Sequence, residues 1–214
     1  SVTGRSMTRG RFITLEGVEG VGKTTNIEFI RELIEQKEID VLVTREPGGT
    51  PLAEDIREVL LQIRDESMDP ITETLLIFAA RSQHVANVIE PALSDGRWVL
   101  CDRYTDATYA YQGGGRGVPL DALERLAEFA QGSLWPDLTI YLDAPVSTAL
   151  GRIADRQHDR FESENHEFFA RVRAGYLAIV EREQRAVLID ATQSLEEVQS
   201  RLVEIMNNFW DPLG

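Results

Sequence analysis

The stretch Gly17-Val18-Glu19-Gly20-Val21-Gly22-Lys23-Thr24 decides the fold of this chain. An apolar run, residues 12–15, precedes the stretch, and a segment that can form a helix, residues 25–36, follows it. Glycines at this spacing allow a tight turn whose backbone N–H groups point inward, and this geometry suits phosphate oxygens. The order strand, glycine-rich turn, Lys-Thr and helix therefore predicts a phosphate-binding P-loop at a helix N-terminus.

The last two residues of the loop carry side chains that suit a nucleoside triphosphate. Lys23 is placed to reach the β- and γ-phosphates, and the Thr24 hydroxyl is a suitable ligand for Mg²⁺. Residues 17–24 are therefore the candidate ATP-binding residues, and Lys23 is a candidate catalytic residue.

Composition describes an ordinary globular chain with one unusual property, its acidity. The chain has 214 residues, of which 43% are hydrophobic and 27% charged, and its net charge is −14. This length predicts one domain with a buried core. The negative charge argues against binding to nucleic acid or to an anionic membrane surface. An acidic protein that handles phosphates must concentrate its arginines locally.

Processing and location signals are few. The segment 1–6 before Met7 resembles a remnant of expression cloning, so we expect a single natural domain over residues 7–214. We find no apolar run long enough to span a membrane. Cys101 is the single cysteine. It lies in an apolar run, so we expect it to be buried, and the absence of an intramolecular disulfide favours the cytoplasm.

Five short apolar runs alternate with helix-length segments along the chain. The runs are residues 12–16, 41–45, 98–102, 138–143 and 186–190. The helix candidates that lie between or after them are residues 52–63, 71–93, 120–131, 146–154, 166–183 and 195–209. This alternation predicts an α/β fold in which helices flank a five-stranded parallel sheet in three layers. Thr50-Pro51 and Asp69-Pro70 are expected helix starts.

Polar residues stand where several predicted strands end, and ligands bind at that edge of an open parallel sheet. Asp102 and Arg103 follow one strand, and Arg45 ends the strand before it. The aspartate is a candidate for the Mg²⁺ shell, directly or through water, and the arginines can hold a phosphate. Two arginines on one phosphate are what an acceptor monophosphate requires, so these residues predict phosphoryl transfer rather than nucleotide binding alone.

The ordered motifs of the chain resemble those of bacterial thymidylate kinases. The motifs are residues 12–25, 45–50, 102–104, 110–116 and 159–162, and the resemblance extends from residue 12 to about residue 193. It implies a P-loop kinase fold with a small lid and transfer of the γ-phosphoryl group of ATP to dTMP, a step in dTTP biosynthesis that uses Mg²⁺. It also implies a homodimer, and the long segment 71–93 could supply its interface.

The resemblance also implies roles for individual residues that bind dTMP. Arg45 and Arg103 would hold the phosphate, and Phe78 would stack on the thymine. The others implied to contact the base or sugar are Arg81, Thr108, Tyr111 and Gln112. Phe78 and Arg81 are three residues apart, which places them on one face of a helix. Family members usually carry Ser where this chain has Ala107, which makes Thr108 and Gln112 the less secure assignments.

The P-loop contains no arginine, although phosphoryl transfer needs cations on the transferring group. Arg152, Arg156 and Arg160 recur at four-residue spacing, so on a helix they would share nearly one face. The resemblance implies that residues 151–163 form a lid that closes over ATP. We expect Arg156 to be the main transition-state contact, with Arg152 and Arg160 as alternatives, and Glu19 to lie beside the acceptor phosphate or its Mg²⁺ shell.

Other classes of P-loop protein are the alternatives. A GTP-binding switch would need an Asn-Lys-x-Asp or Thr-Lys-x-Asp motif, and the chain has neither. A deoxynucleoside kinase would need an acid poised as a base rather than acceptor-side arginines. Another nucleoside monophosphate kinase remains open, and so does a plain nucleotide-binding module, in which the lid arginines would have no purpose.

Overall fold

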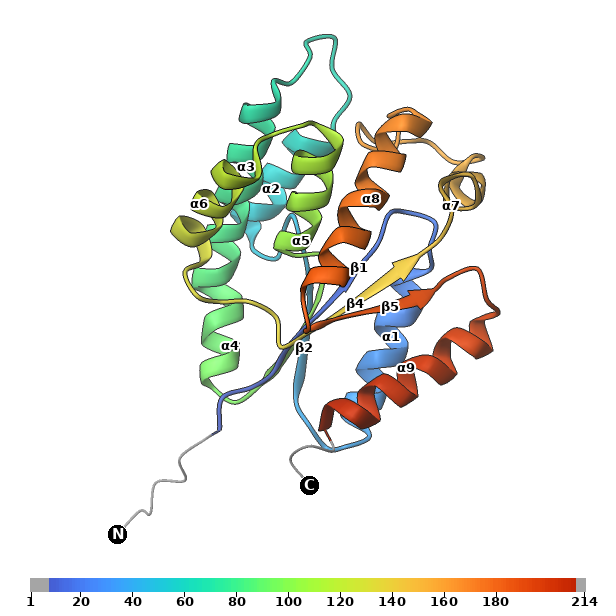
Figure 1. Ribbon diagram of the computed structural model, residues 1–214. Helices are drawn as coiled ribbons and strands as arrows, with labels where there is room; N and C mark the ends of the chain where they lie inside the picture. The colour runs from blue at the N-terminus through green and yellow to red at the C-terminus, as the bar shows by residue number, and fades with distance from the viewer. Residues whose placement is uncertain (1–7, 211–214) are drawn as a thin grey trace.

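The computed structural model describes residues 8–210, so the expected cloning remnant at residues 1–6 lies outside the described part (Figure 1). Five parallel strands form one sheet in the order β2-β3-β1-β4-β5. Their bounds are β1 (Phe12–Glu16), β2 (Val41–Arg45), β3 (Trp98–Asp102), β4 (Leu138–Asp143) and β5 (Ala186–Asp190). The predicted strand bounds and the α/β class are confirmed.

Burial along the strands follows their place in the sheet. β1 is central, with Phe12 opposite Val99 of β3 and Ile13 opposite Leu138 of β4. All five residues of β1 are buried, whereas the edge strands β2 and β5 are partly exposed. A strand covered on both faces must be apolar throughout, which explains why the central run is continuous rather than alternating.

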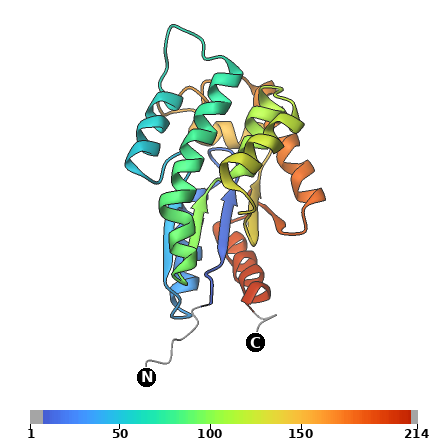
Figure 2. The ribbon, with the colours of Figure 1, turned by 90° about the vertical axis from the view of Figure 1, so that its left-hand side faces the viewer.

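Helices cover both faces of the sheet and complete three layers (Figures 1 and 2). On one face, α1 (Lys23–Glu35) packs against β1–β3, and α9 (Leu195–Trp210) packs against α1 and β5. On the other face, α4 (Glu90–Ser94) contacts β3, and α8 (His166–Arg182) contacts β4 and β5. The remaining long helices are α2 (Pro51–Leu61), α3 (Pro70–His84), α6 (Leu120–Gln131) and α7 (Val146–Ile153).

The expected helix starts are present as side-chain caps. Thr50 Oγ1 accepts a hydrogen bond from Ala53 N at 3.0 Å, and Asp69 Oδ2 accepts one from Ile71 N at 3.0 Å. These caps satisfy N–H groups that have no partner within the helix. The long helix predicted over residues 71–93 is confirmed in extent, but a π-helical turn, η1 (Val85–Ile89), separates α3 from α4.

A helical segment between β3 and α6 escaped prediction. It consists of α5 (Thr105–Thr108) and a π-helical segment, η2 (Tyr109–Gly115), and it packs along α8. A Cβ at Gly114 would lie 2.8 Å from the Arg171 carbonyl oxygen, and one at Gly115 would lie 2.5 Å from the Phe168 ring. Gly114 and Gly115 are therefore the residues that let this backbone approach α8.

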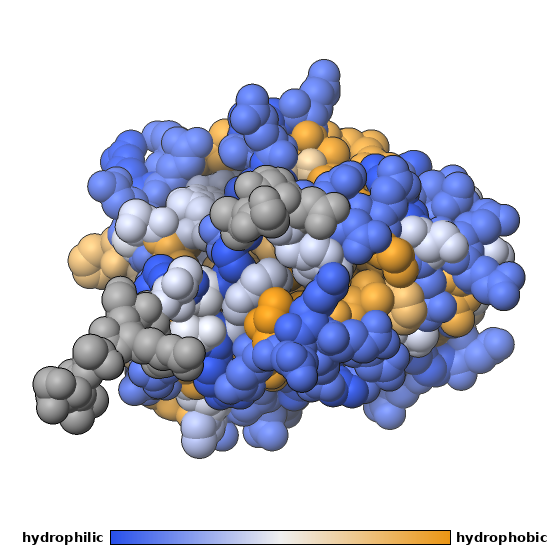
Figure 3. Space-filling model, turned by 90° about the horizontal axis from the view of Figure 1, so that it is seen from below, coloured by the Kyte–Doolittle hydropathy of each residue, from blue (hydrophilic) through white to orange (hydrophobic). Residues whose placement is uncertain are grey.

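The surface seen from below Figure 1 is mostly hydrophilic, and its hydrophobic side chains form small patches (Figure 3). Within residues 8–210, no helix combines the length and the apolar character needed to cross a membrane. Cys101 is buried, as predicted, and burial raises the pKa of its thiol well above the usual value.

Candidate active site

The P-loop joins the carboxyl end of β1 to α1, where the backbone must turn sharply. Gly20 has φ +86°, and a Cβ there would overlap the Ala149 carbonyl oxygen. Gly22 caps α1 in the left-handed region, with φ +88°. Only glycine adopts these conformations readily, so the pattern that predicted the loop is required by its backbone.

Lys23 lies beneath the loop between two carboxylates. Its side chain is 5% exposed, and Nζ is 3.4 Å from Glu19 Oε1 and 3.5 Å from Asp102 Oδ1. Asp102 Oδ1 is buried, yet no group among residues 8–210 donates a hydrogen bond to it. Thr24 is exposed, and it lines the same hollow as Asp102. Because Lys23 Nζ approaches this oxygen without donating a hydrogen bond, the oxygen can still accept one from a cation's water shell or bind the cation itself.

Arg103 connects the P-loop to the next part of the site. Its Nη2 donates to Gly17 O at 3.1 Å, to Glu19 Oε1 at 3.0 Å and to the Tyr111 hydroxyl at 3.3 Å. The Arg103 guanidinium, followed by Lys23, lowers the pKa of Glu19 to about 2, although burial opposes this shift. Glu19 is therefore ionised at neutral pH.

Glu16 holds the backbone turn that aims Arg103. Arg103 has φ +68°, a conformation that residues other than glycine seldom adopt. The next residue, Tyr104, donates its backbone N–H to Glu16 Oε1 at 2.7 Å, while Glu16 Oε2 accepts from the Tyr176 hydroxyl at 2.7 Å. Complete burial, followed by the nearby Asp106 carboxylate, raises the pKa of Glu16 to about 8.

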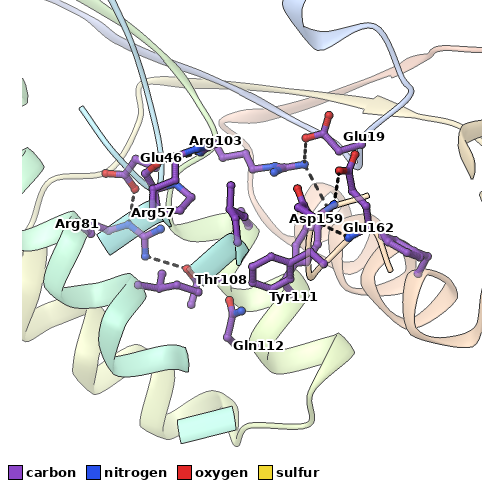
Figure 4. Close-up of a pocket in the computed structure, with 16 residues that line it drawn as sticks. Glu19, Glu46, Arg57, Arg81, Arg103, Thr108, Tyr111, Gln112, Asp159 and Glu162 are labelled. Carbon is purple, nitrogen blue, oxygen red and sulfur yellow. Dashed lines mark hydrogen bonds and ion pairs between the residues drawn. The ribbon is translucent and has the colours of Figure 1, made fainter. Parts of the chain in front are cut away.

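A pocket opens beside Arg103, between α2, α3, η2 and the loop after α7 (Figure 4). Its lining combines apolar, cationic and polar side chains, a composition typical of small-molecule sites. The lining residues are Glu19, Glu46, Pro47, Arg57, Leu61, Ile77, Arg81, Arg103, Ala107, Thr108, Tyr111, Gln112, Asp159, Phe161, Glu162 and Phe169.

Arg57 is a cation of this pocket that sequence reasoning missed. It lies on α2 and donates through Nη1 to Pro47 O at 3.0 Å. Burial, and then the charges of Arg45 and Arg103, lower the pKa of Arg57. Like charges held together in a partly buried place favour an anion, so the Arg57 and Arg103 end of the pocket suits a phosphate.

The opposite end of the pocket is held by a buried charge pair. Arg81 Nε donates to Glu46 Oε1 at 2.6 Å, and Arg81 Nη1 donates to Thr108 Oγ1 at 2.8 Å (Figure 4). The other Glu46 oxygen is 2.7 Å from His84 Nδ1, and His84 Nε2 is 2.7 Å from Thr44 Oγ1. The Arg81 side chain is 3% exposed, so its orientation is set without a ligand.

The sequence of this chain has close counterparts among known proteins. The sequence model of the family described as "Thymidylate kinase" matches residues 15–202. The chain belongs to the thymidylate kinase family. It is 52% identical over 202 residues to a thymidylate kinase of Teredinibacter turnerae, covering 94% of this chain and 98% of that protein. It is 56% identical over 192 residues to one of Pseudomonas putida strain GB-1, covering 89% and 91% respectively.

Among the residues that the resemblance to thymidylate kinases suggested, five line the pocket together: Arg81, Arg103, Thr108, Tyr111 and Gln112. Phe78 does not line it. The Phe78 side chain lies in a core cluster with Tyr109 and Leu123, and Ile77 faces the pocket instead. Ile77 is four residues before Arg81, and this spacing aligns side chains on α3 better than the three-residue spacing of Phe78. The structure therefore does not place Phe78 where it was expected to meet the base.

Arg45 does not reach this pocket. Its side chain is 53% exposed and pairs with Glu54, whose Oε2 is 2.8 Å from Arg45 Nη2. Arg45 lines the adjoining hollow together with Thr24 and Asp102. Arg57 takes the position beside Arg103 that the sequence had assigned to Arg45.

The lid arginines do not share a helix face, because α7 ends at Ile153 and the chain continues in turns. His158 Nε2 lies 2.9 Å from Ile153 O, where it can bond a carbonyl that the helix leaves free. Arg152 donates to Gly20 O at 3.0 Å and to Ala191 O at 3.2 Å. Arg156 forms a short ion pair with Glu162 and lies 3.6 Å from Glu19 Oε2.

Arg160 points away from the P-loop. Its Nη1 is 2.6 Å from Glu73 Oε2, and its Nε donates to Leu60 O at 2.7 Å. The lid expected to cover ATP is therefore divided. Arg152 and Arg156 face the P-loop, whereas Asp159, Phe161 and Glu162 line the pocket.

Proposed function

We propose that this chain transfers the γ-phosphoryl group of ATP to dTMP and produces dTDP and ADP. The observation that carries the proposal is the position of Arg103. One of its nitrogens contacts the P-loop at Gly17 O and Glu19, while the same side chain lines the acceptor pocket. A donor phosphate on the loop and an acceptor phosphate on Arg103 would then be neighbours, as in-line transfer requires.

On the donor side, the backbone N–H groups of residues 17–24 would hold the phosphates of ATP, and Lys23 would neutralise the charge that develops on them. Arg156 would approach the transferring group, because it already lies 3.6 Å from Glu19 on the P-loop. Arg152 bonds to the carbonyl groups of Gly20 and Ala191, so it would stabilise the loop near the donor.

On the acceptor side, Arg57 and Arg103 would hold the phosphate of dTMP. Burial lowers the pKa of the Arg57 guanidinium, and the nearby charges of Arg45 and Arg103 lower it further. A bound dianion would offset this repulsion between cations. The attacking phosphate oxygen is already ionised at neutral pH. Glu19, whose pKa Arg103 lowers to about 2, is therefore proposed to position the groups around it rather than to act as a base.

The base would lie at the buried end of the pocket. Arg81 is held between Glu46 and Thr108 and would donate to an exocyclic oxygen of thymine. Thr108 and Gln112 would contact other polar edges of the base, while the Tyr111 ring would lie against the sugar and favour deoxyribose. Ile77 replaces Phe78 as the α3 side chain proposed to cover the base.

Mg²⁺ is the proposed cofactor, and the residues present fit it. Asp102 contributes a buried oxygen that receives no hydrogen bond from the described residues, and Thr24 contributes a hydroxyl beside the same hollow. These are oxygen ligands, which Mg²⁺ prefers, and few of them are needed because the ion keeps waters and phosphate ligands. When bound, Mg²⁺ supplies charge neutralisation for the phosphates of ATP.

We also propose that the protein is a homodimer formed through α3 and its neighbour α6. Ile71 and Leu75 of α3 are each 51% exposed, and Phe129 of α6 is 92% exposed. Large apolar side chains exposed on two helices that contact each other favour a protein interface. Light scattering during size-exclusion chromatography would test this, and a monomeric mass at assay concentration would contradict it.

The proposed reaction is tested by coupled ADP release with ATP, Mg²⁺ and a panel of acceptors. The panel contains dTMP, dUMP, dCMP, GMP, AMP and thymidine. Turnover should be strongest with dTMP. Turnover with thymidine but not dTMP would identify a deoxynucleoside kinase, and no acceptor-dependent turnover would leave a nucleotide-binding module.

A further inference from the structure

Glu73 is a buried carboxylate that the proposed reaction does not use. It lies in the first turn of α3, and its side chain is 1% exposed. Gln112 Nε2 donates to Glu73 Oε1 at 2.7 Å, and Arg160 Nη1 lies 2.6 Å from Glu73 Oε2. Arg116 donates to each oxygen at 3.2 Å. The Glu73 carboxylate thus contacts η2 through Gln112, the residue directly after η2 through Arg116, and the lid through Arg160.

The first consequence concerns the amide of Gln112. An ionised carboxylate accepts hydrogen bonds and cannot donate them, so Glu73 must face the NH₂ group of Gln112. The side-chain amide of glutamine has a donor NH₂ group and an acceptor oxygen, so fixing the position of the NH₂ group also fixes the position of the oxygen. No described residue donates to Gln112 Oε1, which leaves this oxygen as the acceptor for the pocket that Gln112 lines.

An acceptor at this position selects among pyrimidine bases. Thymine and uracil carry a proton on ring nitrogen N3 and can donate it, whereas N3 of cytosine is an acceptor. A site built to bond one of these groups rejects the other, because two buried acceptors would face each other. The orientation of Gln112 therefore disfavours cytosine, and Glu73 determines that orientation.

The second consequence concerns the lid. Arg160, which binds Glu73, also donates from Nε to Leu60 O at 2.7 Å and from its backbone N–H to Leu61 O at 2.9 Å. Its neighbour Phe161 lines the pocket. Glu73 thus contacts both a residue of the pocket wall, Gln112, and the part of the lid that lines the same pocket.

We propose that Glu73 is a positioning residue that sets the base preference of the pocket and couples base binding to lid closure. This inference rests on the proposed function, since it assigns the pocket to the base of the acceptor. Filling the pocket would steady Gln112, and the shared carboxylate would transmit this to Arg160. Coupling of this kind is reciprocal, so an anchored lid should also strengthen base binding.

The base preference is tested with Glu73→Gln, because a glutamine can either donate to or accept from Gln112. We expect the ratio of kcat/KM for dTMP to that for dCMP to fall by about tenfold or more, as expected when a hydrogen-bond donor and acceptor are no longer fixed. Glu164→Gln is the matched control. It removes the same charge from Arg116 without touching Gln112 or Arg160, so the ratio should stay at its wild-type value.

The coupling to the lid is tested by hydrogen exchange of residues 154–165 with and without dTMP. In the wild type, dTMP should slow exchange in this segment, and in Glu73→Gln it should no longer do so. Arg160→Met is a second variant that keeps the contact between Glu73 and Gln112. In Arg160→Met, dTMP should no longer slow exchange in residues 154–165, whereas the ratio of kcat/KM for dTMP to that for dCMP should stay at its wild-type value. This variant separates the effect on the lid from the effect on base preference even where Glu73→Gln folds poorly.

These outcomes separate the inference from the proposed reaction. An unchanged base ratio in folded Glu73→Gln, or protection by dTMP that survives in both variants, would overturn the role of Glu73. Absence of dTMP turnover in the wild type would instead overturn the proposed reaction. Exchange of residues 154–165 without nucleotide still tests the anchor in that case, since it should be faster in both variants than in the wild type.

Discussion

The two ends of the active site differ in how their charges are compensated. At the base end, Arg81 and Glu46 are both buried and are held by each other and by Thr108 and His84. At the donor end, the side chain of Arg156 is 52% exposed and Glu19 is 36% exposed. We infer that the base end is formed before substrate binds, whereas the donor end receives its final charge arrangement from ATP.

Arg156→Met should have the largest effect on turnover and little effect on folding. We expect kcat to fall by about 10²-fold or more, because a cation near the transferring phosphate acts mainly in the transition state. The free energy of unfolding should fall by only about 1 kcal/mol, because Arg156 is half exposed and its buried partner Glu162 still accepts a hydrogen bond from Asp159 N. Steady-state kinetics and urea unfolding measure the two effects. A normal kcat would assign the transition-state role to another residue.

Arg81→Met should reverse this pattern. It leaves the Glu46 carboxylate buried beside His84 without its arginine, so we expect the free energy of unfolding to fall by about 3–5 kcal/mol. The KM for dTMP should also rise. Adding Glu46→Gln removes the uncompensated charge and should recover part of the stability but not the affinity. Urea unfolding of both variants checks this, and equal stability of wild type and Arg81→Met would contradict a preformed base end.

Glu16 makes the free energy of unfolding depend on pH, because its folded-state pKa of about 8 lies above the usual value of 4.5. Between these values the unfolded chain is ionised at this residue while the folded chain keeps its proton, so stability falls as pH rises. Glu16→Gln removes this titration. The wild type should lose on the order of 3–4 kcal/mol relative to this variant between pH 5 and 8, as proton linkage predicts.

Urea unfolding of the wild type and Glu16→Gln at several pH values measures this difference. A constant difference between the two proteins across this range would show that Glu16 titrates normally. Stability rising toward alkaline pH relative to the variant would reverse the sign of the argument.

Ala107→Ser should have the smallest effect of the four substitutions. Ala107 lines the pocket and is 8% exposed, so a hydroxyl there can reach the acceptor. One additional neutral hydrogen bond contributes about 1 kcal/mol, so we expect the KM for dTMP to fall no more than about tenfold. Steady-state kinetics with dTMP measure this change. A higher KM would show that the hydroxyl crowds the base rather than binding it.

The sequence predicted the sheet well because local chemistry determines its features. All five strand bounds are as expected, and Thr50 and Asp69 cap the helices that follow them. Apolar runs, proline positions and capping side chains act within a few residues of one another, so they can be read along the chain. The P-loop belongs to the same category, since its glycines are required by its own backbone.

The pocket was predicted less completely because its geometry depends on distant segments. Arg57 carries no motif of its own, and only the fold brings it to Arg103. Phe78 and Ile77 are neighbouring apolar residues on one helix, so composition alone does not decide which one faces the pocket. The helix predicted over residues 146–154 ends at Ile153, where His158 can bond the last turn, so the three lid arginines do not share the face that a longer helix would have given them.

The contact between η2 and α8 restricts how this site can diverge. On the side of η2 that meets α8, Gly114 and Gly115 leave no space for a Cβ, so substitution there would separate the two elements. On the pocket side, Ala107, Thr108 and Gln112 project from the same helical segment toward the acceptor. Single side-chain changes on one side of the segment can therefore alter acceptor preference, while a change of either glycine on the other side would move the whole segment.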